Sequence, residues 1–409
     1  MAWTKRQRNV VIAAYLGWTL DAFDFFLMVF MFKDIAADFH SSMQKVSTAV
    51  LLTLAMRPIG AFFFGRLADR FGRKPALTWN ILAYSLLEMA SGFAPTMTTL
   101  LVIRALFGVA MGGEWGIGSA LTMETIPPSA RGLVSGLLQA GYPSGYFLAS
   151  VVNGLFYDRL GWRYMFVLGV VPAILVFFVR RGIDESPAWR EQQAGPRAAI
   201  GEVVARNWKL AIYAVALMTA FNFFSHGSQD AYPTFLKSQH HFDTHLAALM
   251  TAVGNIGAIC GGLLFGSLSQ VIGRRRAIMI AVLIALPVLP FWAFAVTPLT
   301  LGLGAFAMQL AVQGAWGVIP AHLNELSPAE IRGTFPGFVY QLGNLLAAAN
   351  LNLQVYIAEA NGGNYGLALG IVVGTVAVLI SLLVAFGPER SGVAMYAASA
   401  PPPVGESAP

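Results

Sequence analysis

Residues 65–74 read Gly65-Arg66-Leu67-Ala68-Asp69-Arg70-Phe71-Gly72-Arg73-Lys74, a charged run that separates two apolar stretches. A degenerate copy begins 201 residues later, where Gly266, Gly273 and Arg274 repeat both glycines and the arginine after the second. The same offset aligns further pairs, which are Asp21 with Asn222, Gly60 with Gly261, Gly113, Trp115 and Gly116 with Gly314, Trp316 and Gly317, and Glu124, Pro127, Arg131 and Gly132 with Glu325, Pro328, Arg332 and Gly333. Composition bias explains glycine pairs, but not tryptophan, glutamate and arginine pairs in one register. The chain therefore consists of two repeated halves.

The composition places these halves in a membrane. Of 409 residues, 56% are apolar and 11% are charged, whereas soluble domains are roughly 25% charged. A helix needs about 20 apolar residues to cross the hydrocarbon core. Twelve such stretches lie near residues 9–32, 45–67, 76–95, 98–123, 133–156, 164–181, 210–236, 246–270, 277–297, 300–322, 334–357 and 365–387. We predict an all-α membrane protein with twelve transmembrane helices, in two six-helix halves that form a parallel repeat.

The first apolar stretch follows basic residues and resembles a signal peptide. It is too long for one, carries Asp21 and Asp24, and lacks a small-residue cleavage site. We therefore expect a retained transmembrane helix.

The predicted boundaries give an N-terminal half over 1–181, a charged cytoplasmic linker over 182–208, a C-terminal half over 209–388 and a disordered cytoplasmic tail over 389–409. In the linker, Ser186 is expected to cap a helix that begins at Pro187. With the N-terminus inside, the cytoplasmic segments hold nineteen lysines and arginines and the other side holds five. The positive-inside rule therefore predicts that both termini are cytoplasmic.

Charge and cysteine content exclude several classes of function. The net charge of +6 reflects the loop bias, and no basic run with interleaved aromatic residues indicates nucleic-acid binding. The single cysteine, Cys260, rules out an internal disulfide and a thiolate metal site. Glycine pairs such as Gly112-Gly113 lack the lysine of a phosphate-binding loop. We expect no enzyme activity, cofactor or metal.

The run at 65–74 and its copy resemble the signature loop of the Major Facilitator Superfamily. Arg104-xxx-Gly108-xxx-Gly112 and Gly141-Tyr-Pro143-Ser-Gly145 are similar to two further motifs of that superfamily. The resemblance covers the whole chain and implies the major facilitator fold. Asp69, Arg70 and Arg73 are then expected to bind helix ends across a cytoplasmic gate that opens when the halves rock.

A second resemblance is carried by residues 222–234, Asn222-Phe-Phe-Ser225-His226-Gly227-Ser228-Gln229-Asp230-Ala-Tyr-Pro233-Thr234. This run resembles the signature of lactate/pyruvate:proton symporters of the fungal carboxylate-permease type, in the sialate:proton symporter family. The sialate branch carries two additional helices in its middle, whereas this chain has a short polar linker there. The resemblance therefore favours a small monocarboxylate over a sialic acid.

The chemistry of the polar intramembrane residues supports the same function. Polar groups in a bilayer usually face a cavity, and at helical spacing Asn222, His226, Gln229, Asp230 and Pro233 share one face. Arg57 lies about twelve residues into its helix and can hold a carboxylate through two parallel hydrogen bonds. The alternative is that Arg57 only neutralises Asp21 or Asp24. Substrate binding is therefore assigned to Arg57, Asn222, His226 and Gln229.

Four residues are candidates for proton coupling. Burial and a nearby arginine act in opposite directions on a carboxyl group, so Asp21 or Asp24 can change protonation when substrate displaces a partner. His226 and Asp230 are the alternative site, since histidine titrates nearest neutral pH. A purely structural role for His226 also remains open. Gly227 and Pro233 are expected to let this helix bend as an outer gate.

Nine other intramembrane polar residues are expected either to line the cavity or to join helices by hydrogen bonds. They are Glu114, Gln139, Asn153, Gln309, Gln313, Gln341, Asn344, Asn350 and Asn352. A pair between Arg104 and Glu114 is not expected, since ten residues along one helix separate them too far.

The sequence thus predicts a proton-coupled symporter of a small monocarboxylate, such as lactate or pyruvate, in a bacterial inner membrane. It is expected to work by alternating access and to function as a monomer. The alternatives are a symporter of sialic acid or another organic acid, and a transporter-like nutrient sensor. Such sensors usually carry a large cytoplasmic domain, which the short tails here do not provide.

Overall fold

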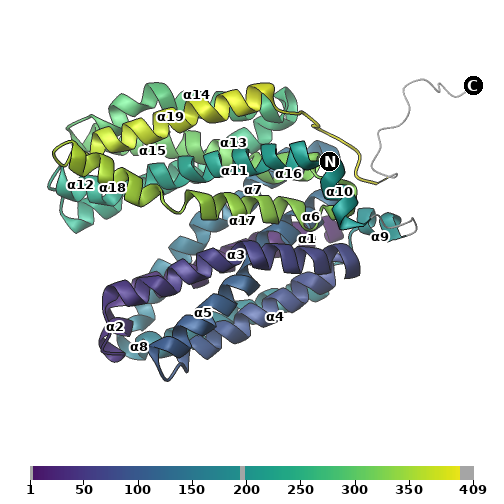
Figure 1. Cartoon of the computed structure of the whole chain (residues 1–409), viewed down its shortest axis with the longest axis horizontal. Coiled ribbons are helices and arrows are strands. Elements are labelled where there is room, and N and C mark those ends of the chain that lie inside the picture. The colour runs from purple at the N-terminus through teal and green to yellow at the C-terminus, as the bar shows by residue number, and fades with distance from the viewer. Residues whose placement is uncertain (1–2, 194–198, 397–409) are drawn as a thin grey trace, which may run out of the picture.

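The computed structural model describes residues 3–193 and 199–396, which form helices and connecting loops with no strand among them. Two helical halves lie one above the other in Figure 1, with the N-terminal half below. The N-terminal half contains α1 (Lys5–Phe30), α2 (Phe32–Asp38), α3 (Met43–Phe71), α4 (Arg73–Gly92), α5 (Met97–Gly112), α6 (Glu114–Thr125), η1 (Pro128–Ala130), α7 (Arg131–Gln139) and α8 (Gly141–Arg181). Helix α8 is kinked at Gly161, whose φ is 67°.

The linker and the C-terminal half follow the same plan. The linker holds α9 (Pro187–Gln193) and α10 (Ile200–Arg206). The C-terminal half contains α11 (Trp208–Gln229), α12 (Tyr232–Ser238), α13 (Thr244–Ile272), α14 (Arg274–Ala293), α15 (Pro298–Trp316), α16 (Ile319–Leu326), η2 (Ala329–Ile331), α17 (Phe335–Ala347), α18 (Asn350–Ala360) and α19 (Tyr365–Phe386). We call the end of the molecule that carries α9 and α10, at the right of Figure 1, the linker side.

The helices trace the twelve predicted membrane crossings. Among the described residues, eight helical segments are by length and composition able to span a membrane. Several crossings are interrupted rather than continuous, and the interruptions recur in both halves. Breaks at Met31 and at 230–231, for example, agree with the repeat offset to within one or two residues and interrupt the first and seventh crossings.

Local sequence accounts for the helix boundaries. Thr4, Ser42, Thr96 and Asp243 each accept a backbone N–H of the first turn and so cap the helix that follows. Gly72 and Gly273 separate consecutive helices with φ values of 110° and 91°, where a side chain would be strained. This conformation explains why both copies of the charged loop keep that glycine.

The predicted helix start in the linker is confirmed. The backbone N–H of Trp189 donates to the hydroxyl of Ser186 at 3.1 Å, and Pro187 is the first residue of α9.

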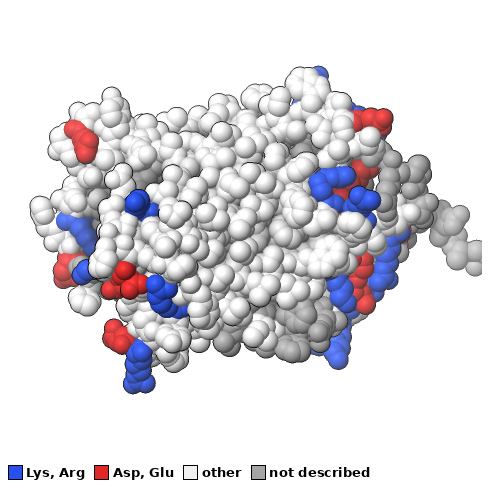
Figure 2. All heavy atoms as spheres, turned by 60° about the horizontal axis from the view of Figure 1, so that its bottom comes forward, with Lys and Arg blue, Asp and Glu red and all other residues white. Residues whose placement is uncertain are grey.

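On the face drawn in Figure 2, charged side chains gather at the two ends of the molecule. Figure 2 shows Lys, Arg, Asp and Glu at both ends of the displayed face, with an uncharged belt between them. Large apolar side chains such as Phe62, Leu86, Phe147 and Leu303 are about half exposed or more. A belt of this kind suits hydrocarbon, because apolar side chains meet no cost there.

Glycine backbones bring the two halves into contact on the linker side. A Cβ atom on Gly65 would lie 2.6 Å from Thr334 Cα, and one on Gly132 would lie 2.4 Å from the Gly266 carbonyl oxygen. A Cβ atom on Gly136 would lie 2.3 Å from the Gly262 carbonyl oxygen. Side chains at these positions would separate the halves, so the linker side is closed by backbone-to-backbone packing.

The segment after Gly387 differs in part from the expected disordered tail over 389–409. Glu389 accepts the backbone N–H of Arg275 at 2.9 Å, and Met395 is 8% exposed against the N-terminal half. Residues 389–396 therefore have a defined position, because they pack on the linker side. Residues 397–409 of the expected tail lie outside the described part of the chain.

Candidate functional site

A cavity of about 410 Å³ lies between the two halves. The N-terminal half lines it from α1, α3, α7 and α8, and the C-terminal half lines it from α11 to α15 and from α17. Aromatic rings form much of the wall, contributed by Trp18, Phe25, Phe26, Tyr142, Tyr146, Tyr232, Trp292, Trp316 and Tyr340. Among the described residues that line the cavity, Arg57 is the one lysine or arginine.

Arg57 is buried at the cavity wall and faces a carboxylate. Its Nη2 atom lies 3.8 Å from Asp21 Oδ2, and the two side chains are 4% and 1% exposed. The same Nη2 atom lies 2.7 Å from Met111 Sδ, and the guanidinium lies 5.5 Å from the centre of the Phe25 ring. A separation of 3.8 Å is a long ion pair without a hydrogen bond, and both carboxylate oxygens of Asp21 lack a hydrogen-bond partner. The expected contact between Arg57 and Asp21 is therefore present, but it leaves the guanidinium with capacity for another carboxylate.

His226 and Asp230 form a second ionisable pair on the opposite wall. His226 Nδ1 lies 3.1 Å from Asp230 Oδ2, and its Nε2 lies 3.0 Å from Asn344 Oδ1. Both side chains are about one third exposed, at 35% and 36%. Both ring nitrogens thus face oxygen atoms, an arrangement that a doubly protonated ring satisfies. The orientation of the Asn344 amide is an assignment from the network, since nitrogen and oxygen are alike in size.

The other polar residues of the 222–234 run also reach the cavity, except Thr234. Its lining includes Asn222, Ser225, Ser228, Gln229 and Pro233 together with His226 and Asp230. Gln229 donates to Gln309 Oε1 at 3.1 Å. Of the nine other polar residues considered, Gln139, Gln309, Gln313 and Asn344 line the cavity and the other five do not. The predicted polar stripe of this helix therefore faces one space.

Asp24 lies in a different pocket, inside the N-terminal half. It is 1% exposed, its Oδ1 atom has no hydrogen-bond partner, and it does not line the cavity. A Cβ atom on Gly169 would lie 3.2 Å from Asp24 Oδ1 and 3.4 Å from Glu88 Cγ, so the two carboxyl groups share one pocket. Arg104 Nη2 binds Glu88 Oε2 at 2.6 Å. Two buried carboxyl groups and one guanidinium are electrically neutral only when one carboxyl group holds a proton.

Glu88 is a buried carboxyl group that the sequence reasoning missed. The signal is simple, since Glu88 lies in the middle of the apolar stretch 76–95, just as Asp21 and Asp24 lie in theirs. Its partner Arg104 comes from the neighbouring helix α5. That pairing depends on how the helices pack, which spacing along one helix does not predict.

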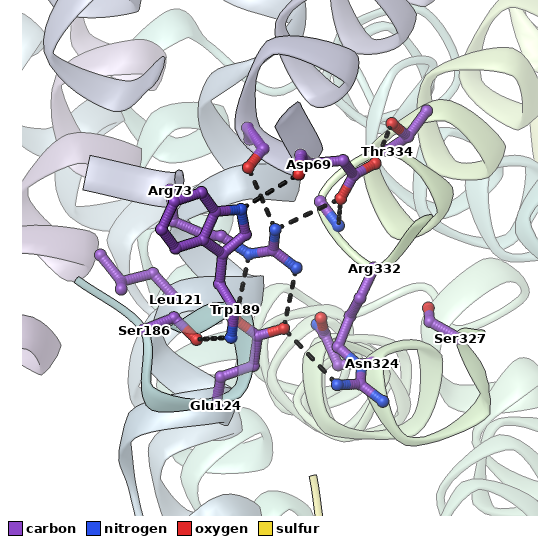
Figure 3. Close-up of polar contacts among 12 residues, drawn as sticks. Asp69, Arg73, Leu121, Glu124, Ser186, Trp189, Asn324, Ser327, Arg332 and Thr334 are labelled. Atoms are coloured by element: carbon purple, nitrogen blue, oxygen red, sulfur yellow. Dashed lines mark hydrogen bonds and ion pairs between the residues drawn. The ribbon is translucent and has the colours of Figure 1, made fainter. Parts of the chain in front are cut away.

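An ionic network joins the halves on the linker side (Figure 3). Asp69 accepts the Gly333 N–H at 2.7 Å and the Thr334 hydroxyl at 2.6 Å. Arg73 binds both oxygens of Glu124, at 3.0 and 3.1 Å. Arg332 of the other half approaches Glu124 at 3.5 Å.

The sequence repeat produces a second copy of this network. Arg274 binds both oxygens of Glu325, at 2.8 and 2.9 Å, and Arg131 of the other half approaches Glu325 at 3.6 Å. Gln270 takes the place of Asp69 and accepts the Gly132 N–H at 3.0 Å. The residues that align at an offset of 201 thus make equivalent contacts in the two halves.

The expected gating residues occupy three kinds of position. Asp69 and Arg73 take part in the linker-side network, whereas Arg70 is exposed and its guanidinium lies over the ring of Phe71. Arg70 thus makes its contact on the surface, because successive residues of a helix are turned by about 100° and Arg70 points away from the closure that Asp69 faces. Gly227 and Pro233 flank the break between α11 and α12 at 230–231, and the Gly227 carbonyl accepts from Gln354 at 2.7 Å.

The family follows from a comparison of the whole sequence with known families. The sequence profile of the Major Facilitator Superfamily matches residues 14–350. The chain belongs to this superfamily. Its membership confirms the predicted fold class and shows that the protein is a membrane transporter and not an enzyme.

Related members of the Major Facilitator Superfamily include transporters of organic acids. The chain is 29% identical to the sialic acid transporter NanX of Escherichia coli over 395 residues, covering 94% of this chain and 96% of NanX. It is 28% identical to a carboxylic acid transporter protein homolog of Saccharomyces cerevisiae over 421 residues, covering 93% and 68%. It is 29% identical to a probable 4-methylmuconolactone transporter of Cupriavidus pinatubonensis over 420 residues, covering 96% and 94%.

The fold is also that of a solved major facilitator structure. The proton:xylose symporter XylE, bound to 6-bromo-6-deoxy-D-glucose, superposes with a TM-score of 0.78 over 95% of this chain and 97% of XylE. The identity between the two sequences is 18%, so this likeness concerns the fold.

Proposed function

We propose that the protein is a proton-coupled symporter of a small monocarboxylate, with lactate and pyruvate as the first candidates. The observation that carries the proposal is the position of Arg57, the one described lysine or arginine at the cavity wall, opposite His226 and Asp230. A carboxylate that leaves water needs a cation and hydrogen-bond donors in exchange. The guanidinium of Arg57 and the amides of Asn222 and Gln229 supply both. The resemblance of the 222–234 run to lactate/pyruvate:proton symporters supports the same substrate class.

Alternating access, together with the charge bias, indicates which side of the membrane the cavity faces. The positive-inside bias assigns the linker side to the cytoplasm, so a closed linker side corresponds to an outward-facing transporter. The cavity then receives substrate from outside, past Asp230 and Pro233. The linker-side network must separate before the substrate leaves on the other side.

The Arg57–Asp21 pair provides a means of coupling substrate to proton. A substrate carboxylate that binds Arg57 in two hydrogen bonds displaces Asp21 from its only cation within 4 Å among the described residues. An ionised Asp21 without a partner is costly in this buried position, so it takes up a proton. Substrate and proton then neutralise the site together and cross as one electroneutral load.

Asp24 and the His226–Asp230 pair are the other candidate proton sites. The Asp24–Glu88–Arg104 pocket holds one proton by charge balance, and Asp24 is one helical turn from Asp21. The His226 ring is open to the cavity and takes its proton from there. Variants of Asp21 and Asp24 separate the two carboxyl groups of α1 from each other and from the His226–Asp230 pair.

The experiment is uptake of radiolabelled L-lactate and pyruvate into proteoliposomes of purified protein, with and without an inward proton gradient. We expect uptake to overshoot equilibrium only with the gradient. Uptake that is equal under both conditions would contradict proton symport, and absence of uptake for both acids would contradict the substrate.

A sialic acid is the second candidate substrate. The similarity to NanX favours it, and so does a cavity of about 410 Å³, within the range of roughly 300–1,000 Å³ for sites that hold much larger ligands than lactate. Competition decides between the two. Inhibition of lactate uptake by excess lactate but not by excess sialic acid supports the monocarboxylate, and the reverse preference supports the sugar acid.

A further inference from the structure

The C-terminal segment bonds to both halves of the transporter on the linker side. We call residues 391–396 the strap. The strap follows Glu389, whose carboxylate accepts the backbone N–H groups of Arg274 and Arg275 at 3.3 and 2.9 Å and so holds the chain at the start of α14. From that anchor in the C-terminal half, the strap runs onto the N-terminal half.

Two hydrogen bonds attach the strap to an ion pair between the halves. The backbone N–H of Gly392 donates to Glu325 Oε1 at 3.1 Å, and Arg131 Nη1 donates to the Val393 carbonyl oxygen at 2.6 Å. Arg131 and Glu325 belong to opposite halves and are themselves 3.6 Å apart, with side chains 0% and 1% exposed. The strap therefore supplies hydrogen-bond partners to both members of a buried pair across the closure.

A methionine fixes the end of the strap to the N-terminal half. Met395 is 8% exposed and belongs to an apolar cluster formed by residues of α1, α6, α7, α9 and α16 and of the loop after α6, which are Val11, Ala14, Met123, Ile126, Val134, Leu138, Ala188 and Ala321. All of these except Ala321 lie in the N-terminal half or the linker. Met395 thus holds the end of the strap on the N-terminal half, whereas Glu389 holds its start on the C-terminal half, so the strap spans the closure.

We infer that the strap is a releasable clasp that holds the linker side closed and favours the outward-facing state. Opening of the linker side separates Arg131 from Glu325, so the strap cannot keep both hydrogen bonds and the methionine contact at once. It must leave the closure in each transport cycle. The inference concerns the resting balance between the two states of the transporter and does not depend on which substrate is carried.

Two truncations separate the effect of removing the strap from the effect of removing the residues that follow it. The reporter is a cysteine at position 119 (Ser119→Cys) in a Cys260→Ser background, since Ser119 is 3% exposed and accepts a hydrogen bond from Asn324 across the closure. One truncation ends at Arg390 and removes the strap, and the other ends at Tyr396 and retains it. The rate of alkylation by a small maleimide is measured on purified protein without substrate.

We expect removal of the strap to raise the alkylation rate about tenfold, since two hydrogen bonds and a buried methionine are lost from the closed state alone. The truncation after Tyr396 should react at the rate of the full chain. Equal rates for the two truncations would overturn the inference.

A pair of point variants repeats the test without a change in length. Met395→Ser removes the buried contact, whereas Val393→Ala alters a side chain that is 36% exposed and keeps the backbone carbonyl. A higher rate for Met395→Ser than for Val393→Ala supports the clasp, and equal rates overturn it. Gel filtration and thermal unfolding of each variant show that the fold is intact, and the point variants decide the question if the shorter truncation does not fold.

Discussion

At the scale of single residues, the site depends on one guanidinium and on carboxyl groups that compete for it. Arg57 reaches Asp21 only at 3.8 Å, so the pair is weaker than one with hydrogen bonds. Arg73 and Arg274, in contrast, each bind a carboxylate in two hydrogen bonds. In the closure, each of these arginine–carboxylate pairs has two hydrogen bonds. In the cavity, the Arg57–Asp21 pair has none, so the guanidinium can bind a substrate carboxylate.

Arg57→Lys should raise the KM for uptake by roughly tenfold or more, because an ammonium cannot reproduce the planar two-bond contact with a carboxylate. The amount of protein in the membrane should not change. Arg70→Lys is the matched control, since Arg70 is exposed and stacks on Phe71. Unchanged KM and uptake in Arg57→Lys would remove this residue as the carboxylate ligand.

Asp21→Asn or Asp24→Asn, whichever removes the coupling carboxyl group, should abolish the effect of the proton gradient on net uptake while substrate-for-substrate exchange continues. An amide in either position cannot take up the coupled proton. The measurement is the accumulation ratio in proteoliposomes with and without the gradient. If both variants remain fully driven by protons, coupling belongs to His226 and Asp230.

Glu88→Gln tests whether the pocket beside Asp24 holds a shared proton. Each single variant, Asp24→Asn or Glu88→Gln, leaves one carboxylate for Arg104 and should fold. The double variant leaves the buried guanidinium of Arg104 without a carboxylate partner, which costs about 3–5 kcal/mol. We therefore expect the double variant to lose more thermal stability than the sum of the two single losses. Additive effects would indicate that the two carboxyl groups do not share Arg104.

At the scale of helices, glycines decide how closely the halves approach. Gly136 on α7 faces the Gly262 carbonyl of α13, and no side chain fits between them. Interrupted helices also contribute to the closure. Helices α6 and α16 each begin after a break and place Glu124 and Glu325 at the contact between the halves. These features explain why the linker side closes without a bulky plug.

Gly136→Ala should shift the transporter toward the state with an open linker side, because its Cβ atom would lie 2.3 Å from the Gly262 carbonyl oxygen. Alkylation of the cysteine at position 119 reports the shift. Gly154→Ala is the control, since a Cβ atom there meets nothing within 4 Å. The same alkylation rate in both variants would show that the α7–α13 contact does not limit closure.

At the scale of the whole molecule, closure is a property of the repeat. Glu124 and Glu325 each stand between an arginine of their own half and one of the other half. Because two equivalent networks act in parallel, neither half controls the linker side alone. The strap bonds to the network that holds the Arg131–Glu325 pair. At the other network, Glu185 of the linker accepts the backbone N–H groups of Arg73 and Lys74, as Glu389 accepts those of Arg274 and Arg275.

Glu124→Gln and Glu325→Gln should each favour the state with an open linker side. Either change leaves two arginines near an uncharged amide, and loss of one partner from a buried pair costs about 3–5 kcal/mol. Spin labels on the linker-side ends of the two halves measure the populations of short and long distances. A distance distribution unchanged from the unsubstituted protein would contradict the role of these carboxylates in closure.

The sequence by itself determined the fold class, the repeat and the polar stripe of α11. Hydropathy works because a bilayer forces each crossing into a helix of fixed length, and the repeat register even predicted which arginines and glutamates are equivalent. Periodicity placed Asn222, His226 and Gln229 on one face because neighbours along a helix are set by local geometry alone. The start of α9 followed from Ser186 and Pro187 for the same reason.

Only the tertiary structure decided which residues from different helices meet. Glu88 joins Asp24 and Arg104 because α4 packs against α5 and against α8, where Gly169 lies close to both carboxyl groups. The side chain of Asp69 points toward the other half, and that of Arg70 points to the surface. This difference depends on which face of α3 packs against the other half. The strap was hidden in a segment whose composition predicts disorder, yet one methionine and two backbone groups bind it. Such contacts join residues far apart in the chain, and local spacing carries no information about them.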